Sequence, residues 1–244
     1  MSMRKIIVTL ANALKSNWLG RTVYPFFSKV WHLYADPARR KRLQKNGYSL
    51  LSEIFEISKK ECLNLFPMYG TLLGFEREGG FIPWDDDIDL GFIDENDSIK
   101  RVADVLVKKY NFAFYHALKY HERIAEFTLV RNNITVDFFP LHKEDDSLMA
   151  KAFYWREDVE YDSTNANSAY YMRHPMIDSL VPMTVHGVEI MVPQNKLDVI
   201  VAEFGENWRV PNANFSEMEL PAFIGKDDFG YAVEEPEFWS LLDN

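Results

Sequence analysis

The stretch Tyr69–Phe92, YGTLLGFEREGGFIPWDDDIDLGF, decides the fold of this 244-residue chain and concentrates its chemistry. It places four aspartates within five residues, directly after a Pro-Trp pair. We predict a strand from Asp87 to Phe92, in which alternate side chains face opposite sides. Asp87 and Asp89 then share a polar face, and the opposite, apolar face is formed by Ile88, Leu90 and Phe92. The pattern predicts an acidic site on one side of a buried strand.

The two carboxylates of Asp87 and Asp89 favour a bound cation. Two ionised carboxylates about 5 Å apart repel by roughly 3 kcal/mol at an effective dielectric of about 20, and a cation relieves that repulsion. Oxygen ligands of this kind suit Mg²⁺ or Mn²⁺, held by one or two carboxylates together with substrate phosphates. A bare Asp-x-Asp pair is equally compatible with an acidic turn or a solvated strand edge.

The residues before the aspartates favour the metal interpretation. Gly70-Thr71 and Gly79-Gly80 flank a segment with helical character, Leu72–Glu78. Glycines permit close approach of the backbone to a ligand. A helix that begins near Thr71 offers free N–H groups and the positive end of its dipole to a phosphate. The flanks therefore predict a phosphate-binding turn beside the acidic strand.

This segment resembles the signature of the LicD/fukutin-related phosphotransferases, a branch of the nucleotidyltransferase-fold superfamily. Asp87 and Asp89 resemble its metal-binding pair, and Gly70-Thr71 its phosphate-contacting turn. The rest of the motif is matched by Leu73, Gly74, Arg77, Gly79, Gly80, Pro83, Trp84, Asp85 and Asp86. The sequence departs from the family's usual residues at Phe75, Glu76 and Glu78. The resemblance extends over Phe66–Pro211.

A second acidic position stands in the apolar run Ile134–Leu141. Strand alternation places Asp137 on the face opposite Ile134, Val136 and Phe138. Burying a charge without a partner is costly, so the residues alone leave open an edge strand with Asp137 in solvent. The resemblance implies instead that Asp137 is a third carboxylate, on a strand beside that of Asp87 and Asp89.

The resemblance implies a metal-dependent enzyme with a CDP-linked donor. It would transfer a phospho-substituted alcohol (phosphocholine-like, phosphoethanolamine or a polyol phosphate) to a hydroxyl of a cell-surface glycan. The acceptor would be of the lipopolysaccharide, capsule or teichoic-acid type. Two rivals remain: a nucleotidyltransferase that moves NMP and releases pyrophosphate, and a non-catalytic binder of nucleotide or glycan. An intact acidic triad argues against the binder.

Roles for the site residues follow from the same resemblance. The implied ligands of Mg²⁺ or Mn²⁺ are Asp87, Asp89 and Asp137, the last of which completes the metal site or acts as base. The other implied roles are phosphate contact by Gly70 and Thr71, leaving-group stabilisation by Arg77 and acceptor positioning by Asp85. Asp86 lies off the acidic face, where we expect a structural hydrogen-bond acceptor.

Charge divides the chain into two parts. The net charge is −10 and the pI about 5.1, which is the wrong sign for a general nucleic-acid binder, so we expect no nucleic-acid partner. Residues 1–45 nevertheless carry ten basic side chains and one acid. We predict a basic, aromatic N-terminal helical region at 1–46 and a nucleotidyltransferase-like catalytic domain at 47–244. The N-terminal region either contacts an anionic membrane surface or packs on the body of the protein. We expect a cytoplasmic protein, either free or peripheral at the inner face of the membrane.

The remaining pattern predicts an α+β fold, in which a small mixed sheet is flanked by helices. We expect a helix over Ser49–Leu65, capped by Ser49 or Ser52, with Cys62 as a buried thiol. Further helices are predicted from Asp97 to Tyr110 and over Gln194–Gly205. Strands are predicted at 66–69, 111–118, 124–131, 149–155 and 188–193. Residues 212–244 carry no functional signal.

Overall fold

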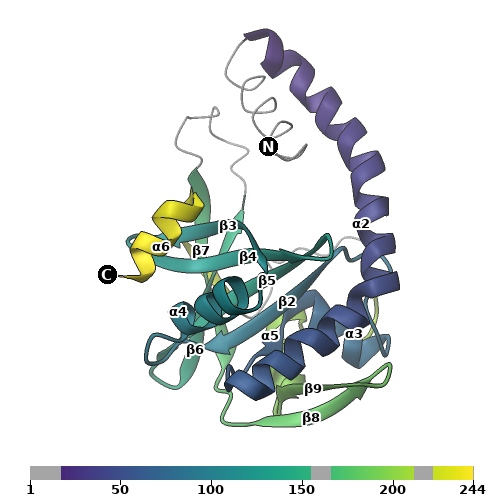
Figure 1. Cartoon of the computed structure of the whole chain (residues 1–244), viewed down its shortest axis with the longest axis vertical. Helices are drawn as coiled ribbons and strands as arrows, with labels where there is room; N and C mark the ends of the chain where they lie inside the picture. The colour runs from purple at the N-terminus through teal and green to yellow at the C-terminus, as the bar shows by residue number, and fades with distance from the viewer. Residues whose placement is uncertain (1–17, 155–165, 212–221, 244) are drawn as a thin grey trace.

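The computed structural model describes residues 18–154, 166–211 and 222–243, and it has the predicted α+β architecture (Figure 1). Its helical segments are α2 (Trp18–Glu61), α3 (Tyr69–Arg77), α4 (Ser98–Ala103), the π-helix η1 (Asp104–Lys109), α5 (Lys196–Phe204) and α6 (Glu235–Leu242). Its strands are β1 (Phe66–Pro67), β2 (Asp87–Ile93), β3 (Ala113–Tyr120), β4 (Arg123–Arg131), β5 (Ile134–Glu144), β6 (Ser147–Tyr154), β7 (Ala166–Pro175), β8 (Leu180–Val185), β9 (Val188–Pro193) and β10 (Phe223–Val233).

The main sheet has eight strands in the order β1-β2-β5-β4-β3-β10-β7-β6, and β8 and β9 form a separate hairpin. The pair β2–β5 is parallel, whereas the other pairs in the sheet are antiparallel. Strand β6 also pairs with the far end of β5. The six strands from β5 to β6 therefore form a closed ring of pairing, with β1 and β2 extending from it.

Strand β2 confirms the alternation predicted for the aspartate run. Ile88, Leu90 and Phe92 are buried in the core, whereas Asp87 and Asp89 are half-buried on the other face. The apolar face packs into the main core because each buried side chain of this size gains about 1.5–3 kcal/mol over an exposed one. Hydrophobic burial on one face thus fixes which way the carboxylates point.

The helix predicted over Ser49–Leu65 is the last part of a single helix of 44 residues, α2. Ser49 and Ser52 lie in its interior, so the predicted capping was wrong. Gly47, which costs about 1 kcal/mol in a helix interior, does not end it, because the helix stays packed before and after this point through Leu43 and Leu50.

Helix α2 also crosses the expected boundary at residues 46 and 47. Residues 1–17 lie outside the described part of the chain, and the two-part division and the membrane contact stay predictions. None of the described helices combines the length and apolar character needed to cross a bilayer.

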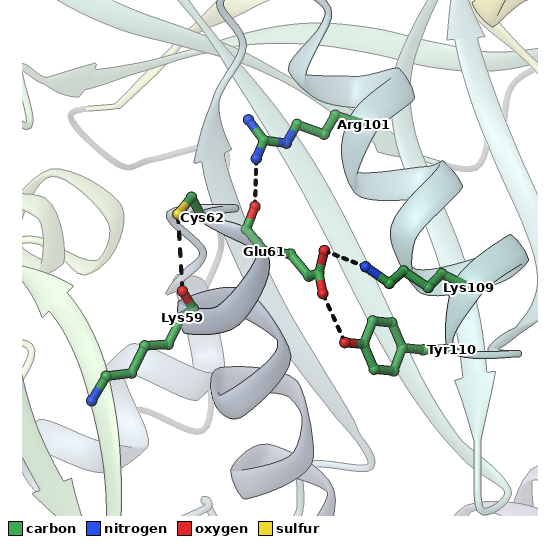
Figure 2. A network of polar contacts seen from close by, with 6 residues as sticks. All are labelled: Lys59, Glu61, Cys62, Arg101, Lys109 and Tyr110. Carbon is green, nitrogen blue, oxygen red and sulfur yellow. Dashed lines mark hydrogen bonds and ion pairs between the residues drawn. The ribbon is translucent and has the colours of Figure 1, made fainter.

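Polar contacts anchor the C-terminal end of α2 (Figure 2). The Glu61 carboxylate accepts hydrogen bonds from Lys109 Nζ at 2.7 Å and from the Tyr110 hydroxyl at 2.8 Å, while Arg101 donates to the Glu61 carbonyl. Cys62 follows in a left-handed turn, with φ 53°, and is exposed. The expectation of a buried thiol was therefore wrong, because the helix ends one residue earlier and the turn places Leu63 inward instead.

Residues 222–243, for which the sequence offered no interpretation, complete the sheet. Strand β10 lies between β3 and β7 and pairs antiparallel with both. Helix α6 then packs Phe238 against Phe114 and Phe127. Without β10, the ring of paired strands would be interrupted between β3 and β7. This segment is therefore part of the domain's core.

A substitution at Gly74 can test how tightly α3 packs on the loop that leads to the aspartates. A methyl group there would lie 2.6 Å from the Gly80 carbonyl oxygen and 3.0 Å from the Ile82 nitrogen. Alanine favours a helix by about 1 kcal/mol over glycine, but the clash is with backbone atoms that cannot rotate away. We expect Gly74→Ala to lower the free energy of unfolding by about 1–3 kcal/mol in chemical denaturation. A gain in stability would show that helix propensity dominates.

Candidate active site

The predicted acidic face is assembled from two adjacent parallel strands. Asp89 on β2 lies opposite Asp137 on β5, and Asp87 lies opposite Thr135. The neighbouring strand β4 contributes Thr128, whose hydroxyl donates a hydrogen bond to Asp137 Oδ1. Parallel strands in register carry their side chains to the same level of the sheet. Asp137 is thus beside the Asp87–Asp89 pair, as the resemblance implied.

The three carboxylates share a low-dielectric, mutually repulsive environment. Burial, followed by the charge of Asp87, raises the pKa of Asp137 to about 7. Burial and the charge of Asp86 raise the pKa of Asp87 to about 6. Burial, together with Asp87, Asp137 and Asp85, places the pKa of Asp89 well above its usual value. Each of these carboxyl groups therefore holds its proton to a higher pH than a free aspartate does, and a cation that compensates the negative charge would oppose that shift.

Asp85 and the first turn of α3 border this acidic face. Burial and the charge of Asp87 raise the pKa of Asp85 to about 7. A methyl group on Gly70 would lie 2.9 Å from Asp85 Oδ2 and 3.6 Å from Asp89 Oδ2, so the lack of a Cβ lets both carboxylates lie close to this turn. Thr71 is buried, and its Oγ1 accepts a hydrogen bond from the Asp89 N–H at 2.9 Å. The predicted phosphate turn therefore lies against the acidic strand.

The structure corrects the predicted start of the helix and shows which groups Arg77 contacts. Helix α3 begins at Tyr69, two residues earlier than expected from the glycines. Arg77 lies at its other end, where Nε donates to Glu78 at 2.8 Å and Nη1 to the Trp208 carbonyl at 3.2 Å. Its side chain is 11% exposed. Burial dominates the pKa of Asp85, and the charge of Arg77 opposes that shift.

Two acidic residues near the site were missed by sequence reasoning. Glu126 lies on β4 two residues before Thr128, on the same face, and burial followed by the charge of Asp137 raises its pKa to about 8. Glu203 on α5 is buried and accepts the Tyr69 N–H at 3.1 Å; burial raises its pKa to about 8 as well. Each is a lone acid in an apolar run, the signal that identified Asp137.

Glu126 and Glu203 border one cavity together with Asp89. Its volume is about 230 Å³, and its wall also includes the aromatic side chains of Tyr69, Phe139, Phe153 and Phe204. Behind it, the Nδ1 atom of buried His174 lies 3.4 Å from Glu203 Oε1. Burial lowers the pKa of His174 to about 4, so this imidazole is neutral at physiological pH. The acidic face therefore opens into a space with aromatic walls.

The donor set suits a hard cation. Among the described residues, no group of three or more His, Cys, Asp or Glu side chains is arranged so that together they could hold a metal ion. Mg²⁺ does not require such a group, since it is commonly held by one or two carboxylates plus substrate phosphates and water. Asp87, Asp89 and Asp137 provide only oxygen atoms, which favour Mg²⁺ or Mn²⁺ over softer metals. A bound cation would stabilise their ionised forms and so lower these elevated pKa values.

Comparison with protein families identifies one matching model. The model for the nucleotidyltransferase domain of LicD/FKTN/FKRP matches residues 63–195. The matched span includes the turn at Gly70-Thr71 and the three carboxylates of the acidic face, and it excludes all of α2 and all of α5. No curated protein matches the chain significantly.

Proposed function

Because this chain belongs to the LicD/FKTN/FKRP family and carries its nucleotidyltransferase domain, which implies transferase activity, we propose that it transfers a phospho-substituted alcohol from a CDP-linked donor to a hydroxyl of a cell-surface glycan. The transferred group would be phosphocholine-like, phosphoethanolamine or a polyol phosphate. The observation that carries the proposal is the placement of Asp89 opposite Asp137 on adjacent parallel strands, with Asp87 two residues away on the same face. Three desolvated carboxylates can be ionised together at one site only if positive charge joins them.

The acidic face would bind and orient the donor's diphosphate. Asp87, Asp89 and Asp137 would hold Mg²⁺ or Mn²⁺, which neutralises the charge that develops on the phosphate oxygens. Because Gly70 has no Cβ, the acidic face lies close to the first turn of α3, whose free N–H groups would meet a phosphate of the donor. Thr71 supports this arrangement by holding the backbone of Asp89.

The acceptor hydroxyl needs a group that can take its proton. Asp137 would take this role as the alternative to holding the metal, because without a bound cation its pKa, raised mainly by burial to about 7, lies near neutral pH. The hydroxyl of Thr128 occupies Oδ1 of Asp137, which orients the other oxygen of the carboxylate. Asp85, at the edge of the same face, would position the acceptor. Arg77 would act on the Asp85 carboxylate through its charge, because its Nη1 is hydrogen-bonded to the Trp208 carbonyl instead.

The second candidate is a nucleotidyltransferase that moves NMP and releases pyrophosphate. This second candidate is supported by the matching family model, which describes a nucleotidyltransferase domain. Both reactions use the same carboxylates and the same metal, and they differ in the fragment that leaves. A non-catalytic binder would not need three mutually repelling carboxylates at one site.

The leaving group tests the proposal. With Mg²⁺ and a panel of CDP-choline, CDP-ethanolamine, CDP-ribitol and CDP-glycerol, we expect slow release of CMP from one donor even without acceptor, because water can replace the hydroxyl. Chelation with EDTA should abolish the release. Pyrophosphate from CTP with a candidate acceptor, and no CMP from any CDP-linked donor, would replace the proposal with nucleotidyl transfer.

A further inference from the structure

Arg39 brings a positive charge from α2 to the start of the acidic strands. Its Nε lies 3.0 Å from Asp86 Oδ2, and its Nη2 donates to Thr135 Oγ1 at 3.1 Å. Thr135 is the register partner of Asp87 across the β2–β5 pair. The guanidinium is therefore next to the acidic face, and its side chain remains 32% exposed. Arg39 lies outside the span that matches the family model.

The charge balance of the site requires such a group. Six acidic side chains gather on or beside the acidic face, namely Asp85, Asp86, Asp87, Asp89, Glu126 and Asp137. A CDP-linked donor adds one negative charge on each of its two phosphates, and a single divalent cation balances these but not the ionised carboxylates as well. Arg77 is turned toward Glu78 and Trp208. Arg39 is the described cation that pairs directly with an aspartate of the Asp85–Asp87 run.

The geometry of Arg39 leaves capacity for a ligand. A guanidinium has five N–H donors. Asp86 forms an ion pair with Arg39 at Nε, and Thr135 accepts one donor of Nη2. The remaining donors belong to a rigid planar fork that binds phosphate oxygens in pairs. Held on both sides by Asp86 and Thr135, the fork is pre-organised and loses little rotamer freedom on binding.

We propose that Arg39 binds the diphosphate of the donor and that Asp86 and Thr135 hold it in position. This inference rests on the proposed function, because it assumes a phosphate-bearing donor at the acidic face. It makes the C-terminal half of α2 part of the active site. The competing explanation is structural: Arg39 would only neutralise Asp86 and fasten α2 to the sheet.

Arg42 provides the matched control for that structural role. It lies three residues further along α2, and its Nε donates to the Asn133 carbonyl at 3.2 Å. Arg39 and Arg42 thus both connect α2 to the beginning of β5. Within the described part of the chain, Arg42 makes no ion pair with a carboxylate of the acidic face.

The test is the affinity for CDP in the presence of Mg²⁺, measured by calorimetry on the full chain. We expect Arg39→Gln to weaken CDP binding by about 10- to 100-fold, the value of a charge-assisted hydrogen bond. Arg39→Lys should recover part of the loss, and Arg42→Gln should bind within about twofold of the unmodified protein. In turnover, Arg39→Gln should raise KM for the donor more than it lowers kcat. Equal affinities for the two glutamine variants would overturn the proposal.

A double-variant cycle separates phosphate binding from neutralisation of Asp86. If Arg39 serves only to neutralise Asp86, adding Asp86→Asn to Arg39→Gln should restore CDP affinity, and the proposal fails. If Arg39 binds phosphate, the double variant stays weak. Failure of the proposed function has a different signature: the unmodified protein binds CDP in an Arg39-dependent manner but releases no CMP from any donor. A protein that binds no CDP at all contradicts both.

Discussion

Replacing Asp89 with Asn is expected to reduce metal-dependent CMP release by about 10³-fold or more while the protein remains folded. Asp89 is the central carboxylate: Asp137 lies opposite it, and Asp85 and Asp87 both act on its pKa. Asn preserves the shape of the side chain and the backbone hydrogen bond to Thr71, but it removes the negative charge that would hold the cation. Loss of one preorganised electrostatic group alone costs about 10²–10³-fold, and loss of a metal ligand adds to it.

Thermal unfolding separates this effect from misfolding. Burial and neighbouring carboxylates raise the pKa of Asp89, which means that its ionised form destabilises the folded protein. Asp89→Asn should therefore unfold at the same or a higher temperature than the unmodified protein. Asp97→Asn is the matched control, because Asp97 is exposed and has φ 62°, a conformation that Asn adopts readily. Nearly full activity of Asp89→Asn would exclude the acidic face as the reaction site.

The second large effect concerns pH. Without added metal, stability is expected to fall as the pH rises from about 4 to about 7. The pKa of Asp137 is raised from 3.8 to about 7, and that of Asp85 likewise, mainly by burial. In this window the folded protein holds protons that the unfolded chain releases, so raising the pH favours unfolding. Within the window, each such group contributes up to about 1.4 kcal/mol per pH unit.

Added Mg²⁺ should reverse this loss, and more strongly at pH 8 than at pH 5. The cation binds the ionised carboxylates and competes with their protons, so its stabilising effect grows as the protons leave. Melting temperatures at both pH values, with and without Mg²⁺, measure the effect. In an Asp89→Asn/Asp137→Asn double variant the Mg²⁺ effect should disappear. Part of the pH dependence should remain, because burial also raises the pKa of Glu203 to about 8. An equal Mg²⁺ shift at both pH values would contradict the assignment.

Much of the acidic face was predictable because its signals are local. Strand alternation placed Asp87 and Asp89 on one face, and β2 begins at Asp87 as predicted. The lone acid Asp137 in an apolar strand was identified in the same way, and its position beside β2 came from the family resemblance. The same reasoning applied to Glu126 and Glu203 would have identified both. Predictions of helix limits were weaker: α2 passes through Gly47, and Cys62 lies in the turn that follows it.

The sequence by itself determined the strand that carries the aspartates, the side of it that is polar and the glycine turn beside it, since each depends on neighbours within a few residues. Only the tertiary structure decided which distant groups join them. Arg39 reaches Asp86 because α2 packs along the sheet, and Glu203 reaches the first turn of α3 because α5 packs beside it. The elevated pKa values have the same origin. Desolvation depends on atoms supplied by the whole fold, including β10, whose place between β3 and β7 no local pattern revealed.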